Sequence, residues 1–219
     1  MVGKINLPND THRIAVIGRT GSGKTYAGMW HLTMRRFDLM PWVIYDMKRD
    51  QLIADIPYTR EIGLDETPRK PGIYIVRPDP DDNEGLDKSL MNIRRATNIG
   101  IYVDEGFMIG QRSKPFNAIL TQGRSLHIPV IILSQRPVWL TRFVWSESEY
   151  FQVFELSYEE DQKVVKRFAP VDFTKPLPPY YSQYYDVVKK QHVTLKPVPK
   201  GDILLQTFED RLKTRRTYL

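Results

Sequence analysis

Short apolar runs alternate along this chain with longer stretches in which apolar residues recur every three or four positions. The runs have the length and residue types of β-strands, and the stretches between them have the period of helices. Strands are expected at residues 14–17, 42–45, 73–76, 99–103, 129–133 and 150–156, and helices at residues 24–37, 50–56, 85–97 and 115–127. This alternation predicts an α/β fold in which a mainly parallel sheet carries helices on both faces.

The pattern changes after Phe168. Prolines then interrupt regular structure, and residues 183–198 alternate around Lys189-Lys190-Gln191, which predicts a hairpin. A last helix is expected over residues 202–216, where Leu204, Phe208 and Leu212 share one stripe. We therefore expect a core over residues 1–169 and an appendage over residues 170–219, made of the hairpin and a basic helix packed on that core.

Composition adds bounds to this picture. The chain has 219 residues, 41% hydrophobic and 26% charged, which suits a single globular domain. No apolar run approaches the roughly 18 residues that a membrane helix requires. Residues 1–6 carry no hydrophobic signal region, so an intracellular site of action is expected.

The sequence contains no recognisable set of metal ligands and has a modest excess of positive charge. There is no cysteine, which excludes disulfides and thiolate metal sites, and the four histidines are not spaced as metal ligands. Lysine and arginine exceed the acidic residues by 32 to 26, a net charge of +6. This excess suits a polyanion such as nucleic acid, although an ordinary soluble basic protein has the same balance.

The turn after the first expected strand carries the strongest motif. It reads Gly18-Arg19-Thr20-Gly21-Ser22-Gly23-Lys24-Thr25, which matches G-x-x-x-x-G-K-[ST] at every required position. Glycines let backbone N–H groups converge on phosphate oxygens, Lys24 reaches the β- and γ-phosphates, and Thr25 offers its hydroxyl to Mg²⁺. Because a strand precedes the motif and a helix follows it, we expect a P-loop nucleoside triphosphatase of the RecA-like ASCE type that binds ATP and Mg²⁺.

Two carboxylates end the strand expected at residues 99–103. Asp104 is placed to face the Mg²⁺ shell as a Walker B aspartate, and Glu105 to act as the general base that orients or deprotonates water. Gln135, at the end of the next strand, would help to position the γ-phosphate and this water. A solvated acidic turn and an ordinary polar loop residue are the plainer interpretations of the two features.

Together these motifs resemble the FtsK–HerA superfamily of DNA-pumping ATPases. The likeness lies in the P-loop, in residues 43–50 with their Asp46-Met47-Lys48 run, in Val103-Asp104-Glu105, and most specifically in residues 123–137. The resemblance implies non-sequence-specific binding of double-stranded DNA and a pentameric or hexameric ring of identical subunits. It also implies an arginine finger that reaches the neighbouring subunit's nucleotide. Arg124 matches that position, and Arg136 and Arg142 are its rivals.

The size of the chain narrows the resemblance further. The P-loop begins at residue 18, without the membrane domain or β-barrel that precedes the motor in FtsK- or HerA-type proteins. A motor of this size looks like the genome-packaging ATPases of small icosahedral viruses, especially membrane-containing ones. That likeness implies action in the host cytoplasm or at a packaging vertex of the virion, with a portal or capsid-vertex protein as partner.

Three basic stretches are candidates for DNA contact, since a DNA pump grips phosphates without reading bases. They are the loop at residues 106–115 with its Gln111-Arg112-Ser113-Lys114 run, Pro68-Arg69-Lys70-Pro71, and the C-terminal cluster of Arg211, Lys213, Arg215 and Arg216. A solvated loop or helix face is the competing interpretation of each. Trp139, Phe143 and Trp145 are better explained as core or subunit-interface residues than as base-stacking platforms.

Two other classes of function remain open at this point. A small-molecule or nucleotide kinase uses the same core, but the Asp104-Glu105 pair and Gln135 favour water as the acceptor. A Zot-like assembly factor or a GTP-dependent switch is the other alternative, although the chain has no Asn-Lys-x-Asp guanine motif. DNA-stimulated turnover, phosphorylation of a small acceptor, or nucleotide binding without turnover would distinguish the three.

Overall fold

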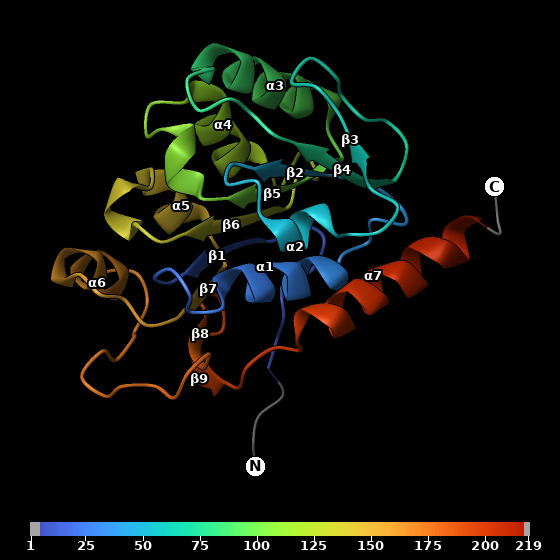
Figure 1. Ribbon diagram of the computed structural model, residues 1–219. Helices are drawn as coiled ribbons and strands as arrows, with labels where there is room; N and C mark the ends of the chain where they lie inside the picture. Colours follow the sequence, from blue (N-terminus) through green and yellow to red (C-terminus); the bar gives the residue numbers. More distant parts are fainter. Residues whose placement is uncertain (1–4, 217–219) are drawn as a thin grey trace.

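A single β-sheet runs through the molecule and carries helices on both faces (Figure 1). The structure is a computed structural model that describes residues 5–216, with side chains described to residue 213. The strands are β1 (Arg13–Ile17), β2 (Pro41–Asp46), β3 (Arg60–Glu61), β4 (Gly72–Val76), β5 (Gly100–Asp104), β6 (Val130–Ser134), β7 (Tyr150–Val153), β8 (Ser182–Asp186) and β9 (Gln191–Leu195). The predicted α/β class is therefore confirmed.

The strand order places the end of β1 in the middle of the sheet. Within the described residues the order is β3-β4-β2-β5-β6-β1-β7-β8-β9. Strands β1 to β7 pair in parallel, and β8 is antiparallel to both β7 and β9. Strand β1 lies between β6 and β7, with β5 next beyond β6, so the turns that follow these four strands meet at one edge.

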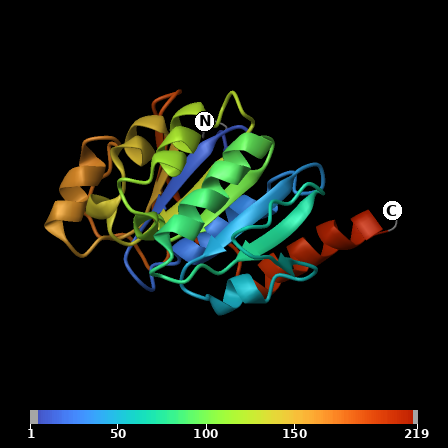
Figure 2. The same ribbon diagram turned by 90° about the horizontal axis from the view of Figure 1, so that it is seen from above.

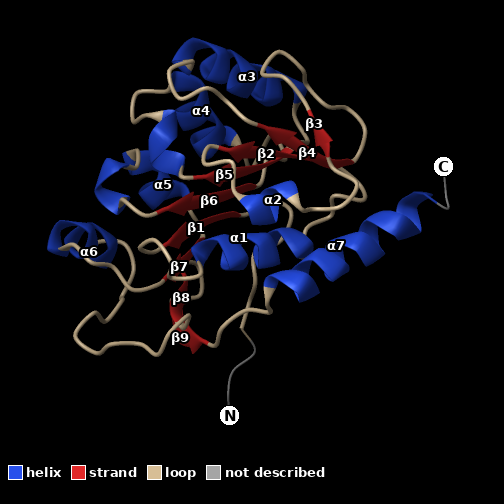
Figure 3. Ribbon diagram, viewed as in Figure 1, coloured by secondary structure: helices blue, strands red, loops and turns tan. Residues whose placement is uncertain are grey.

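Helices cover the two faces of the sheet as separate layers, best seen in Figures 2 and 3. The helix α1 (Lys24–Thr33), the short α2 (Gln51–Ala54) and α7 (Gly201–Arg216) lie on one face. On the other lie α3 (Asn83–Ala96), α4 (Lys114–Gln122), α5 (Arg142–Glu147) and α6 (Glu159–Lys166). Each face has its own buried apolar cluster, which explains why the central strands are buried along their whole length.

The C-terminal segment adds two strands to the sheet, and its helix then packs across one face of the sheet. Strand β8 pairs with β7, and β9 forms the outer strand of the hairpin. The predicted stripe of α7 is confirmed, because Leu204, Phe208 and Leu212 are all buried in the cluster that contains α1. Arg211 adds a polar anchor: its guanidinium donates to the carbonyl of Arg35 at 2.7 Å and lies 4.2 Å from the ring centre of Phe37.

Two expected helices end earlier than the sequence pattern indicates. The helix expected at residues 24–37 ends at Thr33, because Arg35 turns into the protein interior and donates to the carbonyl of Asn9. The helix expected at residues 115–127 ends at Gln122. Gly123 closes it by donating to the carbonyl of Ile119 at 2.7 Å, and residues 123–127 form turns.

Some short elements were not expected at all. These are strand β3, helices α5 and α6, and the 3₁₀ turns Gly106–Ile109 and Pro137–Trp139. The expected strand at residues 150–156 stops at Val153, and the hairpin strands stop at Leu195, three residues before the expected end. Among residues 5–216, no helix combines the length and the apolar character needed to cross a bilayer.

Candidate functional site

Residues 18–25 form the turn between β1 and α1, and this turn is tied to the strands on either side. The N–H of Gly18 donates to the carbonyl of Ser134, at the end of β6, over 3.1 Å. The N–H of Arg19 donates to the carbonyl of Glu155, just beyond β7, over 3.0 Å. The turn is thus fixed at the carboxyl edge of the parallel strands, where ligands of open α/β sheets bind.

The inner part of this turn offers unpaired hydrogen-bond donors. Gly21 and Gly23 have φ angles of 76° and 98°, in the left-handed region that glycine tolerates without strain. Within the described residues, no protein acceptor meets the backbone N–H groups of Gly21, Gly23, Lys24 and Thr25. Unpaired N–H groups at the start of a ten-residue helix are well suited to phosphate oxygens, because the helix dipole also favours a negative charge there.

Glu105 lies against this turn and is completely buried. It follows β5 directly and has a φ of 62°, a strained conformation for a non-glycine residue and one that clusters at active sites. One carboxylate oxygen forms ion pairs with the Nζ atoms of Lys24, at 3.2 Å, and of Lys48. The other accepts the backbone N–H of Gln135 at 3.0 Å. Two cations and an amide therefore hold a buried carboxylate at the P-loop.

The neighbouring Asp104 is buried, and the described residues offer its side chain no hydrogen-bond partner. Both of its carboxylate oxygens lack a donor among the described residues, and the side chain is 1% exposed. Burial, reinforced by the charge of Glu105, raises the pKa of Asp104 to about 7. An unpaired buried carboxylate is costly, and a hard cation would relieve that cost. Asp104, together with the hydroxyl of Thr25 in the first turn of α1, thus fits a Mg²⁺ ion.

Gln135 belongs to the same group of side chains. It follows β6, and its side-chain carbonyl accepts a hydrogen bond from the hydroxyl of Thr20 in the P-loop. Its backbone N–H holds Glu105, as described above. The structure therefore brings Lys24, Glu105 and Gln135 together, with Asp104 beside them at the end of β5.

Arg124 lies away from this group. It is exposed in the turn between α4 and β6, at the amino end of β6, whereas Gln135 follows the carboxyl end. The five residues of β6 separate the two ends by roughly 15 Å. Arg124 lies near His12, which directly precedes β1. Burial lowers the pKa of His12, and the nearby positive charge of Arg124 lowers it further. Arg124 therefore cannot serve the site of its own subunit.

The two rival arginines differ in how free they are. The guanidinium of Arg136 lies 4.1 Å from the ring centre of Trp139 and 4.7 Å from that of Tyr158, and its Nε is 3.2 Å from a carboxylate oxygen of Asp161. These contacts hold α6 against the loop after β6. Arg142 is exposed at the start of α5. Arg136 thus has a structural role within the subunit, whereas the exposed guanidinium of Arg142 lies 5.0 Å from the ring centre of its neighbour Phe143.

The loop at residues 106–115 begins at the site and ends on α4. Its first part is the 3₁₀ turn, and the ring of Phe107 packs 5.5 Å from that of Trp139. The hydroxyl of Ser113 accepts the N–H of Phe116 and so caps α4. Arg112 and Lys114 are exposed. This loop therefore presents two exposed cations at the sheet edge where β5 and Glu105 end.

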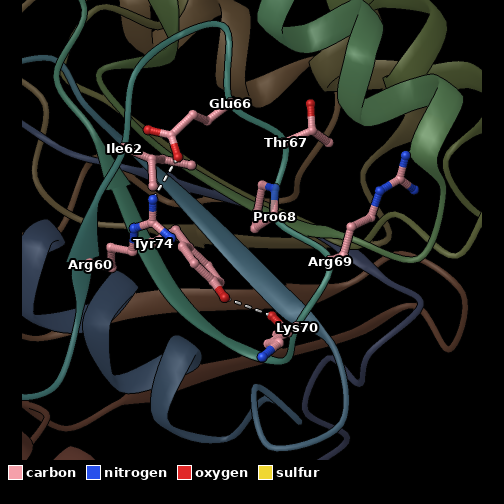
Figure 4. Close-up of a pocket in the computed structure, with 8 residues that line it drawn as sticks. All are labelled: Arg60, Ile62, Glu66, Thr67, Pro68, Arg69, Lys70 and Tyr74. Carbon is pink, nitrogen blue, oxygen red and sulfur yellow. Dashed lines mark hydrogen bonds and ion pairs between the residues drawn. The ribbon is translucent and has the colours of Figure 1, made fainter.

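The second basic stretch surrounds a pocket at the β3 edge of the sheet (Figure 4). The side chains of Arg69 and Lys70 point in different directions there, so they do not converge on one ligand. Arg60 is paired with Glu66 at 2.7 Å, and the hydroxyl of Tyr74 donates to the carbonyl of Lys70 at 2.9 Å. Pro68-Arg69-Lys70-Pro71 also directly precedes β4. It therefore lies at the amino ends of the parallel strands, whereas the P-loop lies at their carboxyl ends.

The C-terminal cluster is more structural than expected. Arg211 is engaged with the chain around Arg35 and Phe37, and Lys213 is paired with Glu209 one turn earlier on α7. The side chains of Arg215 and Arg216 lie outside the described residues.

Lys48 belongs to this site, although the sequence motifs did not assign it a role there. It follows β2, which is the direct neighbour of β5, and the register pairs Asp46 with Asp104. The signal was present in the Asp46-Met47-Lys48 run, but only the strand order shows that this run lies beside the Walker B carboxylates. Asp46 itself is occupied, since it accepts from Arg77 at 3.2 Å and from the N–H of Asp50 at 2.9 Å.

Comparison with known proteins gives one strong relative. The chain is 44% identical over 224 residues to the DNA packaging ATPase P9 of Enterobacteria phage PRD1, and the match covers 97% of this chain and 99% of that protein. No family model matches the chain.

Solved structures with low sequence identity share the fold. The genome packaging NTPase B204 of Sulfolobus turreted icosahedral virus 2, in complex with ATP-γ-S, superposes with a TM-score of 0.70 at 16% identity, covering 87% of this chain and 99% of that one. ATPases 2 and 3 of EssC from Geobacillus thermodenitrificans give a TM-score of 0.65 at 14% identity, covering 94% of this chain and 45% of that one. These likenesses confirm a P-loop ATPase fold. With 44% identity along almost all of its length, the chain belongs to the family of the PRD1 DNA packaging ATPase.

Proposed function

We propose that this protein is an ATP-driven translocase of double-stranded DNA that packages a viral genome. The observation that carries the hydrolytic part is the buried Glu105 carboxylate, held 3.2 Å from Lys24 of the P-loop. The packaging part is supported by the near-full-length identity to a phage DNA packaging ATPase.

Each residue of the site has a role in this proposal. The backbone N–H groups of Gly21, Gly23, Lys24 and Thr25 and the Lys24 ammonium hold the phosphates, while Thr25 and Asp104 would hold Mg²⁺. The ion neutralises charge on the phosphate oxygens when it is bound. Glu105 takes the proton of the attacking water or orients that water, and Gln135 positions it against the γ-phosphate.

The ion pairs of Glu105 describe a resting arrangement. In it the Lys24 ammonium is shared with a carboxylate that also binds Lys48. When a triphosphate binds, Lys24 contacts the phosphates, and Lys48 and the N–H of Gln135 remain to hold Glu105. The carboxylate thus stays in place while the P-loop lysine changes partner.

The assembly is proposed as a homo-oligomeric ring of five or six subunits with a nucleotide between neighbours. In it, Arg124 reaches the γ-phosphate bound by the next subunit, which agrees with its distance from its own P-loop. The exposed Arg112 and Lys114 lie at the same sheet edge as the site and would contact DNA phosphates without reading bases. Residues 1–169 form the ATPase core and residues 170–219 its appendage, and the ring docks on a portal or capsid-vertex protein in the host cytoplasm or at the virion vertex.

The test of the hydrolytic assignment is the Glu105→Gln variant. Because glutamine keeps the shape of the side chain but cannot accept the proton, ATP binding should persist while the turnover rate falls about 100-fold or more. Lys24→Ala should lose phosphate binding itself. Glu159→Gln, on the exposed face of α6, is the matched control and should keep full turnover.

Steady-state ATP hydrolysis with Mg²⁺, together with equilibrium ATP binding, separates these outcomes. A Glu105→Gln variant that turns over ATP at the normal rate would show that the base is another residue. A wild-type protein that binds ATP but transfers its phosphate to a small acceptor rather than to water would contradict the ATPase proposal.

A further inference from the structure

A pocket of about 400 Å³ opens beside the P-loop, on the side of β7 and the C-terminal hairpin. Gly23 of the P-loop forms one wall. The rings of Tyr26, Phe154 and Tyr180 and the segment at residues 197–200 form the rest. The walls come from four places in the chain: the P-loop with the start of α1, the end of β7, the turn before β8 and the link from β9 to α7.

The pocket and the phosphate turn share one surface. A Cβ atom placed on Gly23 would lie 3.2 Å from Cδ1 of Tyr180 and 3.8 Å from Cε1 of Phe154. A side chain at this position would crowd the ring of Tyr180, so glycine lets that ring lie close against the P-loop. Any ligand that fills the pocket therefore lies directly beside the phosphates bound at residues 18–25.

Tyr180 is held in an unusual position. Its φ is 65°, in the left-handed region that a bulky residue rarely occupies, and its side chain is 59% exposed. The next residue closes the turn, since the N–H of Tyr181 donates to the carbonyl of Pro178 at 3.1 Å. Tyr26, on the opposite wall, is 42% exposed. Strain that holds an exposed ring at the mouth of a pocket is typical of a ligand contact.

We propose that this pocket takes the purine base of the nucleoside triphosphate whose phosphates bind the P-loop. The inference rests on the nucleotide binding proposed above and adds the residues that hold the base. The purine follows from the ATP proposed above, and its flat π-face can stack on walls made of aromatic rings and proline. The appendage therefore completes the nucleotide site, with Tyr180 as the base-stacking residue.

The Tyr180→Gly variant tests this directly, because glycine accepts a φ of 65° and so removes the ring without straining the turn. We expect about a tenfold loss of ATP affinity, within the range of single base–aromatic stacks. Affinity for inorganic tripolyphosphate, which has no base, should be unchanged. Tyr180→Phe keeps the ring and should bind ATP as the wild type does. Val188→Ala, exposed in the β8–β9 turn, is the control for disturbance of the hairpin.

Isothermal titration with Mg²⁺ present measures both affinities. Tyr180→Gly binding ATP as tightly as the wild type would overturn the base site. So would an equal loss of affinity for tripolyphosphate, since the ring would then support the phosphate turn rather than the base. Wild-type protein that binds neither ligand would overturn the nucleotide-binding proposal itself, and the base site with it.

Discussion

At the scale of single residues, the carboxylate of Glu105 depends on a lysine from another strand. Lys48 reaches it from the end of β2, and Lys24 reaches it from the P-loop. The two lysines differ in what a bound triphosphate would do to them, because only Lys24 belongs to the phosphate turn. We therefore expect Lys48 to be a positioning residue that holds Glu105 in place while Lys24 contacts the phosphates.

This role makes a prediction for Lys48→Ala. Without the ammonium, the buried Glu105 carboxylate loses an ion pair that holds it in place, so the maximal turnover rate should fall about tenfold or more. ATP affinity should stay within about twofold.

Rescue by arginine distinguishes positioning from a merely structural effect. Lys48→Arg retains the charge and should recover most of the rate. If Lys48→Arg is as slow as Lys48→Ala, the lysine does not act through its charge on Glu105.

Much of the site could be predicted at this scale, because a P-loop and a Walker B strand fix residue types at short range. The sequence placed Lys24, Asp104, Glu105 and Gln135 in one site, and they do lie together in the fold. The role of Lys48 could not be assigned. Its contact with Glu105, 57 residues further along the chain, depends on the pairing of β2 with β5. The position of Tyr180 beside the P-loop could not be predicted either, because it too depends on contacts between distant parts of the chain.

At the scale of elements, α1 is fixed to the sheet by a buried polar chain. The Nε2–H of His31 donates to the side-chain carbonyl of Gln152 on β7 at 2.7 Å, and the amide of Gln152 donates to the hydroxyl of Ser182 on β8 at 2.9 Å. His31 is fully buried, and its Nδ1 has no partner among the described residues. The helix that starts at the P-loop is thus linked to the first strand of the appendage.

This chain predicts a pH-dependent stability. Burial, and then the charge of Arg35, lowers the pKa of His31 from 6.5 to about 3. Between these values the unfolded chain binds a proton that the folded protein does not, so the free energy of unfolding falls as pH falls. From pH 7.5 to pH 5 this one group should remove about 2 kcal/mol.

Urea unfolding at the two pH values measures the effect. His31→Asn cannot be protonated and should show a smaller loss than the wild type. His127→Asn, at an exposed left-handed position, is the matched control and should behave like the wild type. An unchanged pH dependence in His31→Asn would mean that His31 is not held neutral.

The elements that sequence patterns missed are the short ones. Helix α6 has three acidic residues in its first turn and lysines in its last, a charge pattern that favours a helix. With only eight residues, the helix is too short for this pattern to stand out in the sequence. Strand β3 has only two exposed residues, so no apolar pattern marks it. The central strands were found because helices cover both faces and leave continuous apolar runs.

At the scale of the whole molecule, the position of Arg124 argues for an assembly. It lies at the amino edge of the strands, opposite the P-loop edge, so it can act as a finger only on a neighbouring subunit. The sequence could predict the α/β class, but the strand order that separates Arg124 from Lys24 comes from the fold. The hairpin was likewise expected, but its continuation of the sheet beyond β7 was not.

Mixing two inactive variants tests whether Arg124 acts across an interface. Arg124→Ala and Glu105→Gln should each bind ATP and each lose turnover by about 100-fold or more. A mixture should regain part of the turnover, because some interfaces then combine an intact Glu105 with an intact Arg124. Arg95→Ala, exposed on α3, should remain active alone.

Absence of complementation would mean that Arg124 does not act across the subunit interface. Full turnover by Arg124→Ala alone would contradict the finger assignment outright. Arg142 would then be the next arginine to test, since Arg136 is engaged with Asp161 and two aromatic rings.

The most direct test of the whole account is ATP hydrolysis by the purified chain with and without long double-stranded DNA, at low and moderate salt. A DNA motor that grips phosphates through Arg112, Lys114 and their neighbours should be stimulated severalfold by DNA of any sequence. The stimulation should weaken as salt rises, because counterions compete for the same phosphates. Lys24→Ala should show no turnover under any condition. Steady wild-type turnover that is indifferent to DNA at both salt concentrations would contradict the translocase.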